Sequence, residues 1–534
     1  MENPMSRTIK HLPLFIIILI IFPLSLCLQL QTIKNADVVW LLQATQQLLQ
    51  GGHYYTNFIE INPPMILYLY MPALFIANIF SIDVYTAFRL YLYILIALSL
   101  FGCHTLFKQI LSKTDTLTHH LLMIMLAFIL TTLPAYSFGE REHLTVIFTL
   151  PYFLLVALRL THQTPAQRTS FVMGIFAGLG FALKPYFLPP LILTELYFIL
   201  KQKNLLSWIR VETLTIGGVL IAYLISIFIF TPEYLYKILP LVNHFYLNAE
   251  PFSLNEMLGT MLFVFCVAAI IFYFFLLPQL RYRTLATTLW LALIGFLSAY
   301  LIAKRAWFYH LLPALSVATL LFTLFLSESF SALLLTHRHQ KKIYRKQIFL
   351  IVCSVFFITF MPLLRTASFQ SFTSLKRLSS PIQNAQCIVR TYNNGGKPIY
   401  IFTDALLTHT YFTAYAHATS ASRFPALFFI AGLLNQSKKT QIKTIALNQE
   451  IIDLVVNDLQ KNKPALIVID KNKKGSLSRH PHFSYIQFFA HDARFRTLWQ
   501  HYQYRTTIGA FNVFTRRKNK NPRCKQAGYF YFFY

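Results

Sequence analysis

The chain has 534 residues, of which 56% are hydrophobic, 16% aromatic and only 12% charged, and its mean hydropathy is +0.51. These figures exclude a soluble globular protein, a disordered chain and a small disulfide-stabilised domain. The formal net charge is +28. Since much of the chain is apolar enough to lie in lipid, this excess of Lys and Arg indicates anionic lipid headgroups or phosphorylated lipid substrates as partners, and no nucleic acid.

Apolar runs long enough to cross a bilayer recur as far as Leu364, which predicts a polytopic α-helical membrane protein with about 11–12 membrane segments. The segments are expected near 12–30, 64–81, 84–110, 119–135, 144–160, 170–200, 211–231, 257–278, 286–303, 307–327 and 347–364. The stretch 170–200 is expected to be a hairpin of two shorter helices, broken at Lys184-Pro185. Segment 64–81 opens with Pro63-Pro64 and either spans the bilayer or is re-entrant. The first segment is expected to be an uncleaved helix that follows the basic residues Arg7 and Lys10.

The loops between these segments differ in charge, which predicts their side of the membrane. Loops expected in the cytoplasm are basic and carry Lys108 and Lys113, Arg159 and Arg168, Lys201, Lys203 and Arg210, Arg281 and Arg283, and the run 337–346. Loops expected on the extracytoplasmic side are 31–63, 136–143, 232–256 and 304–306. Seven of the 13 acidic residues before residue 365 fall in these outer loops: Asp37, Glu60, Glu140, Glu142, Glu233, Glu250 and Glu256. Polar chemistry is therefore expected on the outer face.

The composition changes after residue 364, where apolar runs become shorter and polar residues intersperse. Here 24 Lys and Arg residues stand against six Asp and Glu. A helix is expected over 446–461, and strands are expected at 398–403, 465–470 and 506–515. The chain is therefore expected to divide into a transmembrane domain, 1–364, and an extracytoplasmic α/β domain with a basic tail, 365–534.

The first outer loop carries a candidate catalytic acid. Asp37 follows the first membrane segment and precedes an amphipathic helix that ends at Gln50, before Gly51-Gly52. A carboxylate just outside the bilayer can stay ionised while it is partly desolvated, which suits a general base. The alternative is that Asp37 only caps the amphipathic helix.

The second outer loop has four ionisable residues in a row: Glu140, Arg141, Glu142 and His143. Such a cluster at a membrane boundary is costly unless its members are paired or functional. The two glutamates are candidate bases or metal ligands, and Arg141 is a candidate anion contact. The alternative is a group of interfacial salt bridges with no catalytic role.

A third group of candidates is cationic. Lys304 and Arg305 precede an aromatic stretch that contains Tyr309 and His310, and these cations are suited to neutralise a phosphate leaving group. Lys184, at the hairpin break, is a possible second phosphate contact. The alternatives are interfacial anchoring for the first pair and a snorkelling side chain for Lys184.

Other motifs give little. The chain contains no Walker motif, no GxGxxG and no HExxH, so a nucleotide site is not indicated. An enzyme of this kind would take its activated substrate from the lipid phase. The segment 420–425, Ser-Ala-Ser-Arg-Phe-Pro, indicates no function by itself.

Taken in order, these motifs resemble those of the GT-C glycosyltransferases, the superfamily that includes the protein O-mannosyltransferases and the lipid A aminoarabinose transferases, in a bacterial branch. The resemblance extends along most of the chain. It rests on Asp37 after the first helix, Gly51-Gly52-x-x-Tyr55, Glu60-x-Asn62-Pro63-Pro64, Arg141-Glu142-His143-Leu144, and Trp307-x-Tyr309-His310-x-x-Pro313. The chain lacks the Asp-Glu doublet of the mannosyltransferases, so the acceptor does not transfer from them.

The resemblance implies roles for residues that match the family's motifs. Asp37 would lie at the catalytic centre, with Glu142 as the second-loop acid and Glu140 as its rival. The residues implied to bind substrate are Glu60, Arg141, His143, Lys184, Lys304, Arg305, Tyr309 and His310. A divalent cation held by Glu60, Glu142 and His143 is a possible cofactor, because some branches of the superfamily use one.

The implied reaction is sugar transfer from a polyprenyl-phosphate donor to an extracytoplasmic lipid, glycan or protein, by a single displacement that inverts the anomeric carbon. The implied location is the plasma (inner) membrane of a bacterium, with several membrane crossings. Two other classes stay open at this point. A transporter or flippase would also use intramembrane charges and a broken hairpin, and a scaffold protein would only keep the fold.

Overall fold

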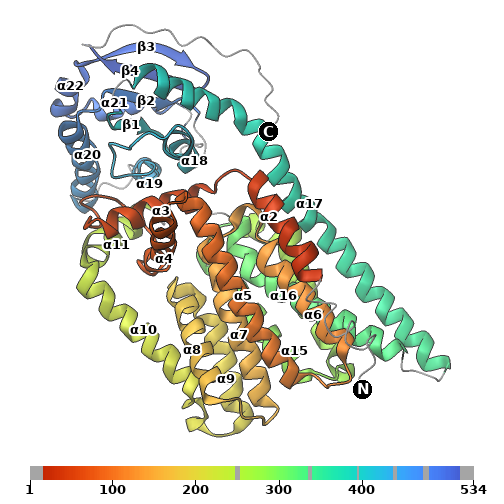
Figure 1. Cartoon of the computed structure of the whole chain (residues 1–534). Helices are drawn as coiled ribbons and strands as arrows, with labels where there is room; N and C mark the ends of the chain where they lie inside the picture. Colours follow the sequence, from red (N-terminus) through yellow and green to blue (C-terminus); the bar gives the residue numbers. More distant parts are fainter. Residues whose placement is uncertain are drawn as a thin grey trace. The chain divides into compact units, whose positions relative to one another are not determined.

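The computed structural model describes residues 16–246, 253–334, 339–393, 396–436, 442–472, 480 and 482–517 (Figure 1). Arg7, Lys10, Glu250, the first residues of the basic run 337–346 and the tail after residue 517 lie outside this part of the chain. The chain forms two compact units. The membrane unit comprises residues 1–33, 62–230 and 252–374, and the second unit comprises residues 34–61, 231–251 and 375–534.

The membrane unit is built from helices that coincide with the predicted apolar segments (Figure 1). They are α2 (Phe22–Gln31), α4 (Met65–Phe80), α5 (Val84–Ile110), α6 (Thr116–Thr131), α7 (Arg141–Leu160), α8 (Gln167–Ala182), α9 (Pro189–Gln202), α10 (Val211–Phe230), α14 (Met261–Leu276), α15 (Arg283–Ala303), α16 (Phe308–Leu334) and the first part of α17 (His339–Tyr392). Among the described residues, six helices are long and apolar enough to cross a membrane, and α4 and α6 are shorter apolar helices. The predicted polytopic helical class is confirmed.

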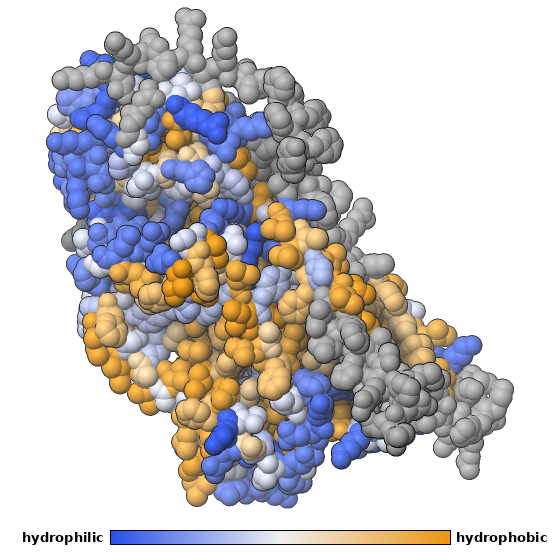
Figure 2. All heavy atoms as spheres, in the orientation of Figure 1, coloured by the Kyte–Doolittle hydropathy of each residue, from blue (hydrophilic) through white to orange (hydrophobic). Residues whose placement is uncertain are grey.

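Apolar side chains predominate over the middle of the membrane unit, and hydrophilic residues gather at its lower end (Figure 2). On α5, Leu90, Ile94, Leu98 and Phe101 are each at least half exposed. They recur every three or four residues and therefore form one stripe along the helix. In water such a stripe would be costly, so it marks the surface that contacts lipid.

Helices α7 and α16 form the interior of the membrane unit. In the apolar 18-residue stretch of each of these two helices, 94% is buried, whereas only 17% of the corresponding stretch of α10 is buried. Helix α7 packs against α5, α8, α15 and α16. Polar groups at the ends of α7 and α16 are therefore held by well-packed helices.

The expected break in the hairpin is confirmed. Helix α8 ends at Ala182, a short 3₁₀ helix follows at Pro185–Phe187, and α9 begins at Pro189. Lys184 has an extended backbone, as is typical of a residue before proline. The break places the Lys184 side chain between two helices instead of on the face of one.

The second unit contains a four-stranded sheet with the order β1-β2-β4-β3, built from β1 (Ile399–Phe402), β2 (Leu466–Asp470), β3 (Tyr502–Ile508) and β4 (Phe511–Arg516). Strands β1 and β2 are parallel and are joined through α20 (Ile442–Asn462), while the other two pairs are antiparallel. The strands expected at 398–403 and 465–470 and the helix at 446–461 are confirmed. The single strand expected over 506–515 is wrong. That stretch is a hairpin, because Gly509 adopts φ +57° and turns the chain between β3 and β4.

The second unit also contains α3 (Ala36–Leu49) and the rest of two loops from the first half of the chain. Residues 34–61 and 231–251 group with residues 375–534, and α17 continues through residue 365 as one helix. The compact units are thus not simple consecutive stretches. The division of the chain into domains 1–364 and 365–534 stays a prediction.

A glycine fixes the packing of α15 on α9. A Cβ atom on Gly295 would lie 2.3 Å from Cα of Pro190, and a backbone atom cannot move aside cheaply. We expect Gly295→Ala to destabilise the protein by about 1–3 kcal/mol, the usual cost of overpacking. Thermal unfolding of the purified protein in detergent would measure this as a lower midpoint.

Gly217→Ala in α10 is the matched control, because a Cβ atom there meets nothing within 4 Å. It should leave the midpoint unchanged or raise it slightly, since alanine favours helix. Equal midpoints for Gly295→Ala and the wild type would contradict the packing described here.

Candidate functional site

The four ionisable residues of the second loop lie at the start of α7. Glu140 immediately precedes the helix, and Arg141, Glu142 and His143 form its first turn. All four are at most 2% exposed. The N-terminus of a helix favours carboxylates because its backbone N–H groups are unpaired and its dipole is positive. The sequence places these residues at a membrane boundary, and the structure buries them among the helices.

The turn before α7 needs glycine at residue 139. Gly139 has φ +91°, and a Cβ atom there would lie 2.5 Å from the ring of Phe88. Its backbone N–H donates to Nδ1 of His143 at 2.9 Å, and Nε2 of His143 lies 2.8 Å from the Leu130 carbonyl oxygen. Because Nδ1 accepts, Nε2 carries the proton and donates. Both ring nitrogens of His143 thus hold the turn, so we do not assign it the substrate contact or the metal ligation that the resemblance implies.

The carboxylate of Glu142 is the centre of a polar cluster in the membrane unit. Its Oε1 accepts a hydrogen bond from Nζ of Lys184 at 2.8 Å, and Nδ1 of His310 lies 3.2 Å from the same oxygen. Arg141 Nε lies 3.8 Å from Oε2. Three segments that the sequence singles out separately, the start of α7, the hairpin break and the start of α16, therefore meet at one carboxylate.

Aromatic rings lie beside this cluster. His310 lies in the first turn of α16, and its ring stacks on Trp307 with centroids 5.9 Å apart and contacts Tyr309 at 4.3 Å. Lys184 Nζ lies 5.1 Å from the ring centre of Tyr186. Glu142, Lys184 and His310 are themselves buried, which strengthens the electrostatic interactions among them.

The structure distinguishes the two neighbouring cations that the sequence gives as candidate phosphate contacts. Lys304 ends α15 in the left-handed conformation, with φ +50°, and its side chain is exposed. Arg305 is 7% exposed, and its guanidinium lies 5.5 Å from the ring centre of Trp307. Since Trp307 stacks on His310, Arg305 belongs to the surroundings of the cluster. We therefore favour Arg305 over Lys304 as a phosphate contact.

One oxygen of Glu142 is available to a further polar group. Within the described part of the chain, Oε2 of Glu142 is buried and has no hydrogen-bond partner. A buried carboxylate oxygen without such a partner is costly. Such groups are uncommon in folded proteins, and a catalytic role is one of the explanations for them.

The second unit holds the first-loop carboxylates. Asp37 is half-buried in the first turn of α3, and the N-cap is Asn35, whose Oδ1 accepts from the Val38 N–H at 3.0 Å. The alternative in which Asp37 caps this helix is therefore wrong. As at α7, a carboxylate lies at the positive end of a helix.

Glu60 is buried in the same unit. Its Oε2 accepts from Nε1 of Trp40, on α3, at 2.6 Å. Burial, together with the Glu60 carboxylate, raises the pKa of Tyr234 above its usual value. The edge of Trp40 meets the ring of His409, and burial lowers the pKa of His409 to about 4, so this histidine is neutral at pH 7. Glu60 thus has a fixed orientation set by an indole donor.

The predicted site residues divide between the two units, and each unit brings its own set together. Asp37 and Glu60 belong to the second unit; the predicted residues of the membrane unit are Glu140, Arg141, Glu142, His143, Lys184, Lys304, Arg305, Tyr309 and His310. In the part of the chain that the structure describes, no group of three or more His, Cys, Asp or Glu residues is placed to hold a metal ion.

Sequence reasoning missed two residues that hold the first loop: Trp40, within the loop, and Arg423, far along the chain. Trp40 holds Glu60, and Arg423 pairs with Asp458 and contacts the loop backbone. The sequence gives one weak signal for Arg423. Only six acidic residues follow residue 364, so an Arg–Asp pair in this region uses one of few carboxylates.

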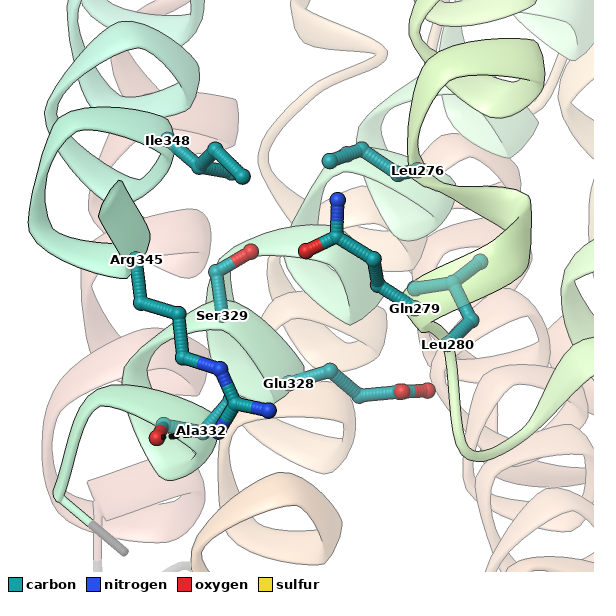
Figure 3. Close-up of a pocket in the computed structure, with 8 residues that line it drawn as sticks. All are labelled: Leu276, Gln279, Leu280, Glu328, Ser329, Ala332, Arg345 and Ile348. Atoms are coloured by element: carbon teal, nitrogen blue, oxygen red, sulfur yellow. Dashed lines mark hydrogen bonds between the residues drawn. The ribbon is translucent and has the colours of Figure 1, made fainter. Parts of the chain in front are cut away.

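A pocket in the membrane unit lies away from the predicted residues (Figure 3). It is lined by Leu276, Gln279, Leu280, Glu328, Ser329, Ala332, Arg345 and Ile348. Glu328 accepts from the backbone N–H of Tyr282 at 3.2 Å, and Arg345 donates to the Ala332 carbonyl at 2.9 Å. These polar groups satisfy the backbone where helices end, so we assign the pocket a structural role.

Comparison with known proteins establishes the fold. ArnT from Cupriavidus metallidurans in its apo state is similar, with a TM-score of 0.50 at 11% identity over 90% of this chain and 92% of that chain. ArnT bound to undecaprenyl phosphate gives a TM-score of 0.47 at 10% identity over 95% and 99% of the two chains. The oligosaccharyltransferase of Archaeoglobus fulgidus gives 0.48 at 14% identity over 96% and 75%. No protein-family model and no curated protein matches the chain.

At such low identity the likeness to apo ArnT concerns the fold alone, and the two matches with TM-scores below 0.5 add nothing to it. The fold that the resemblance implies is confirmed, because apo ArnT shares it. The roles of individual residues rest on the geometry described above.

The pair Lys184–Glu142 gives a direct stability test. Lys184→Met removes the cation and leaves a buried carboxylate uncompensated, which we expect to cost about 3–5 kcal/mol. The double variant Lys184→Met/Glu142→Gln removes both charges and should recover most of that loss. Thermal unfolding in detergent would compare the two variants with the wild type.

Lys201→Met is the control for losing a lysine, because Lys201 is exposed at the end of α9. It should unfold like the wild type. If the double variant is as unstable as Lys184→Met alone, then the two side chains do not compensate each other.

Proposed function

We propose that this protein is a membrane glycosyltransferase that transfers a sugar from a polyprenyl-phosphate donor to an extracytoplasmic acceptor. The observation that carries the proposal is the buried cluster of Glu142, Lys184 and His310 at the helix starts of a GT-C fold. A cluster of charges is maintained in such surroundings only when it is well paired or functional. The neighbouring cations Lys184 and Arg305 suit a phosphate, and the position of the cluster in the membrane unit suits a donor that arrives in lipid.

The cations act on the leaving group. As the bond between the anomeric carbon and the phosphate oxygen breaks, the phosphate leaves with the electron pair and gains negative charge. Lys184 and Arg305 stabilise that charge, which lowers the barrier because the charge develops in the transition state. Arg305 can bind two phosphate oxygens at once, whereas Lys184 acts as a point charge. Glu142 holds Lys184 in place, and Tyr309 and His310 line the site.

The carboxylate of Asp37 is our preferred general base. It accepts the proton of an acceptor hydroxyl while that oxygen forms a bond to the anomeric carbon, on the side opposite the departing phosphate. A single displacement of this kind inverts the anomeric configuration. Glu142 and Glu140 are the second choices for the base, since Glu142 already serves Lys184 as a counter-charge. Glu60 is assigned a contact with the substrate.

The proposed setting is the plasma (inner) membrane, with the active site and the domain 365–534 on the extracytoplasmic face. The acceptor is a lipid, a glycan or a protein, and the sugar is a hexose or a pentose. A transporter or flippase is the second candidate, because charged residues inside a membrane unit also line transport pathways. One observation argues against a transporter: Glu142 and His310 lie at helix ends and not near the middle of the membrane-spanning helices.

The test is transfer of radiolabelled sugar from membrane polyprenyl-phosphate donors by the purified protein in detergent. Asp37→Asn should lower the rate by about 10²–10⁴-fold, the usual contribution of a general base. Asp83→Asn is the matched control, because Asp83 is an exposed carboxylate that caps α5 and asparagine also caps helices. Its rate should equal that of the wild type.

The outcomes separate the possibilities. Unchanged transfer in Asp37→Asn, with a loss in Glu142→Gln or Glu140→Gln, would move the base to the second loop. Absence of transfer by the wild type from every donor class would contradict a glycosyltransferase, and a flux assay with lipid-linked sugars in proteoliposomes would then test the transporter.

A further inference from the structure

The first loop makes a strained corner just before Glu60. Tyr55 has φ +67°, a left-handed conformation that bulky residues rarely adopt. The corner is closed by the Tyr55 N–H, which donates to the Phe58 carbonyl at 2.8 Å, and by the Thr56 N–H, which donates to the Tyr54 carbonyl at 2.7 Å. Strained backbone of this kind persists where its surroundings hold it in place.

Arg423 holds both sides of this corner. Its Nη1 donates to the Tyr55 carbonyl oxygen at 2.9 Å, and its own carbonyl accepts from the Ile59 N–H at 2.8 Å. Ile59 is fully buried and directly precedes Glu60. The backbone position of Glu60 therefore depends on a residue that lies more than 360 positions later in the sequence.

Asp458 fixes Arg423 in turn. Its Oδ1 accepts from Nε and Nη2 of Arg423 at 2.9 and 2.8 Å, and its Oδ2 accepts from the Arg423 backbone N–H at 2.9 Å. Asp458 is 4% exposed and lies on α20. A guanidinium that donates twice to one buried carboxylate, while the backbone N–H of the same residue donates a third bond to it, has little freedom to move.

The same helix supports the corner a second time. Glu450, eight residues before Asp458 on α20, accepts from the Tyr55 hydroxyl at 2.6 Å. Burial and this bond raise the pKa of Tyr55 above its usual value, so the hydroxyl stays a donor. The spacing of eight residues places Glu450 and Asp458 on one face of the helix.

We propose that Arg423, held by Asp458, is a positioning residue for Glu60, so that the C-terminal region sets the place of a first-loop carboxylate. Arg423 sets the backbone before Glu60, and Trp40 sets the direction of its carboxylate. The inference rests on the proposed function in one respect, that Glu60 contacts substrate. The segment 420–425, which indicates nothing by itself in the sequence, gains a role through this contact.

The first test measures the loop itself and needs no activity. Hydrogen–deuterium exchange of the full-length protein in detergent would follow peptides that cover residues 54–60. Arg423→Lys keeps the charge and loses the fork of donors, and Asp458→Asn keeps the side-chain shape. Both should speed exchange in these peptides by about tenfold, because the corner opens more often.

Arg494→Lys is the matched control, since Arg494 pairs with Asp492 at 2.6 Å in the same unit but its side chain is 43% exposed. Exchange at 54–60 should match the wild type in this variant. Wild-type exchange in both Arg423→Lys and Asp458→Asn would overturn the proposal. Asp458→Asn also serves as the second variant if Arg423→Lys does not fold.

The second test asks whether Arg423 acts through Glu60. Sugar transfer would be compared in Arg423→Lys, Glu60→Gln and the double variant. We expect Arg423→Lys to lower kcat by about tenfold or more, and the double variant to be no slower than Glu60→Gln, because a displaced Glu60 and an absent one are equivalent. Fully additive losses would contradict the proposal. If the wild type transfers no sugar, the proposed function fails, and the exchange result still decides whether Arg423 positions the loop.

Discussion

The Glu142 carboxylate lies in the membrane unit without exposure to solvent, and it is tolerated there because Nζ of Lys184 lies 2.8 Å away. This one ion pair joins the start of α7 to the break between α8 and α9, and His310 brings the start of α16 to the same oxygen. A buried charge that loses its partner is strongly destabilising, so these three segments must keep their positions. The interior helices, the hairpin break and the cationic lining of the proposed phosphate site all depend on that constraint.

In the second unit, a neutral donor and a cationic donor hold a buried carboxylate and the backbone before it. Glu60 is held by the indole of Trp40, and the corner before it is held by Arg423. Asp37 has a different environment, since it is half-buried at the positive end of α3 while Asn35 supplies the cap. The described residues thus include a carboxylate that is the counter-charge of a lysine, one that is oriented by an indole donor, and one that is half-buried at a helix start. The proposed transfer reaction assigns a separate role to each of these three carboxylates.

Local patterns in the sequence predict the class of fold, the individual helices and the break at Lys184-Pro185, because apolar length and proline act over a few residues. They also single out Glu142, Lys184 and His310, each as an ionisable residue in an apolar context. They cannot predict that the three meet, since this depends on helix packing between distant segments. Differences between neighbouring residues cannot be predicted either. Lys304 and Arg305 look alike in the sequence, although one is exposed and the other buried. Asn35 and Asp37 both look like helix caps, although only Asn35 is the N-cap. The hairpin at Gly509 is missed because a single alternating run conceals its turn.

The most direct test of this account is the binding of a polyprenyl phosphate to the purified protein, measured by native mass spectrometry with undecaprenyl monophosphate. The account predicts that the wild type and Lys304→Gln bind it equally, because Lys304 is exposed at the end of α15. Arg305→Gln should bind it about tenfold or more weakly, because a buried guanidinium makes strong charge-assisted bonds to phosphate. Equal binding by Arg305→Gln and the wild type, or no binding by the wild type, would contradict a lipid-phosphate site in the membrane unit.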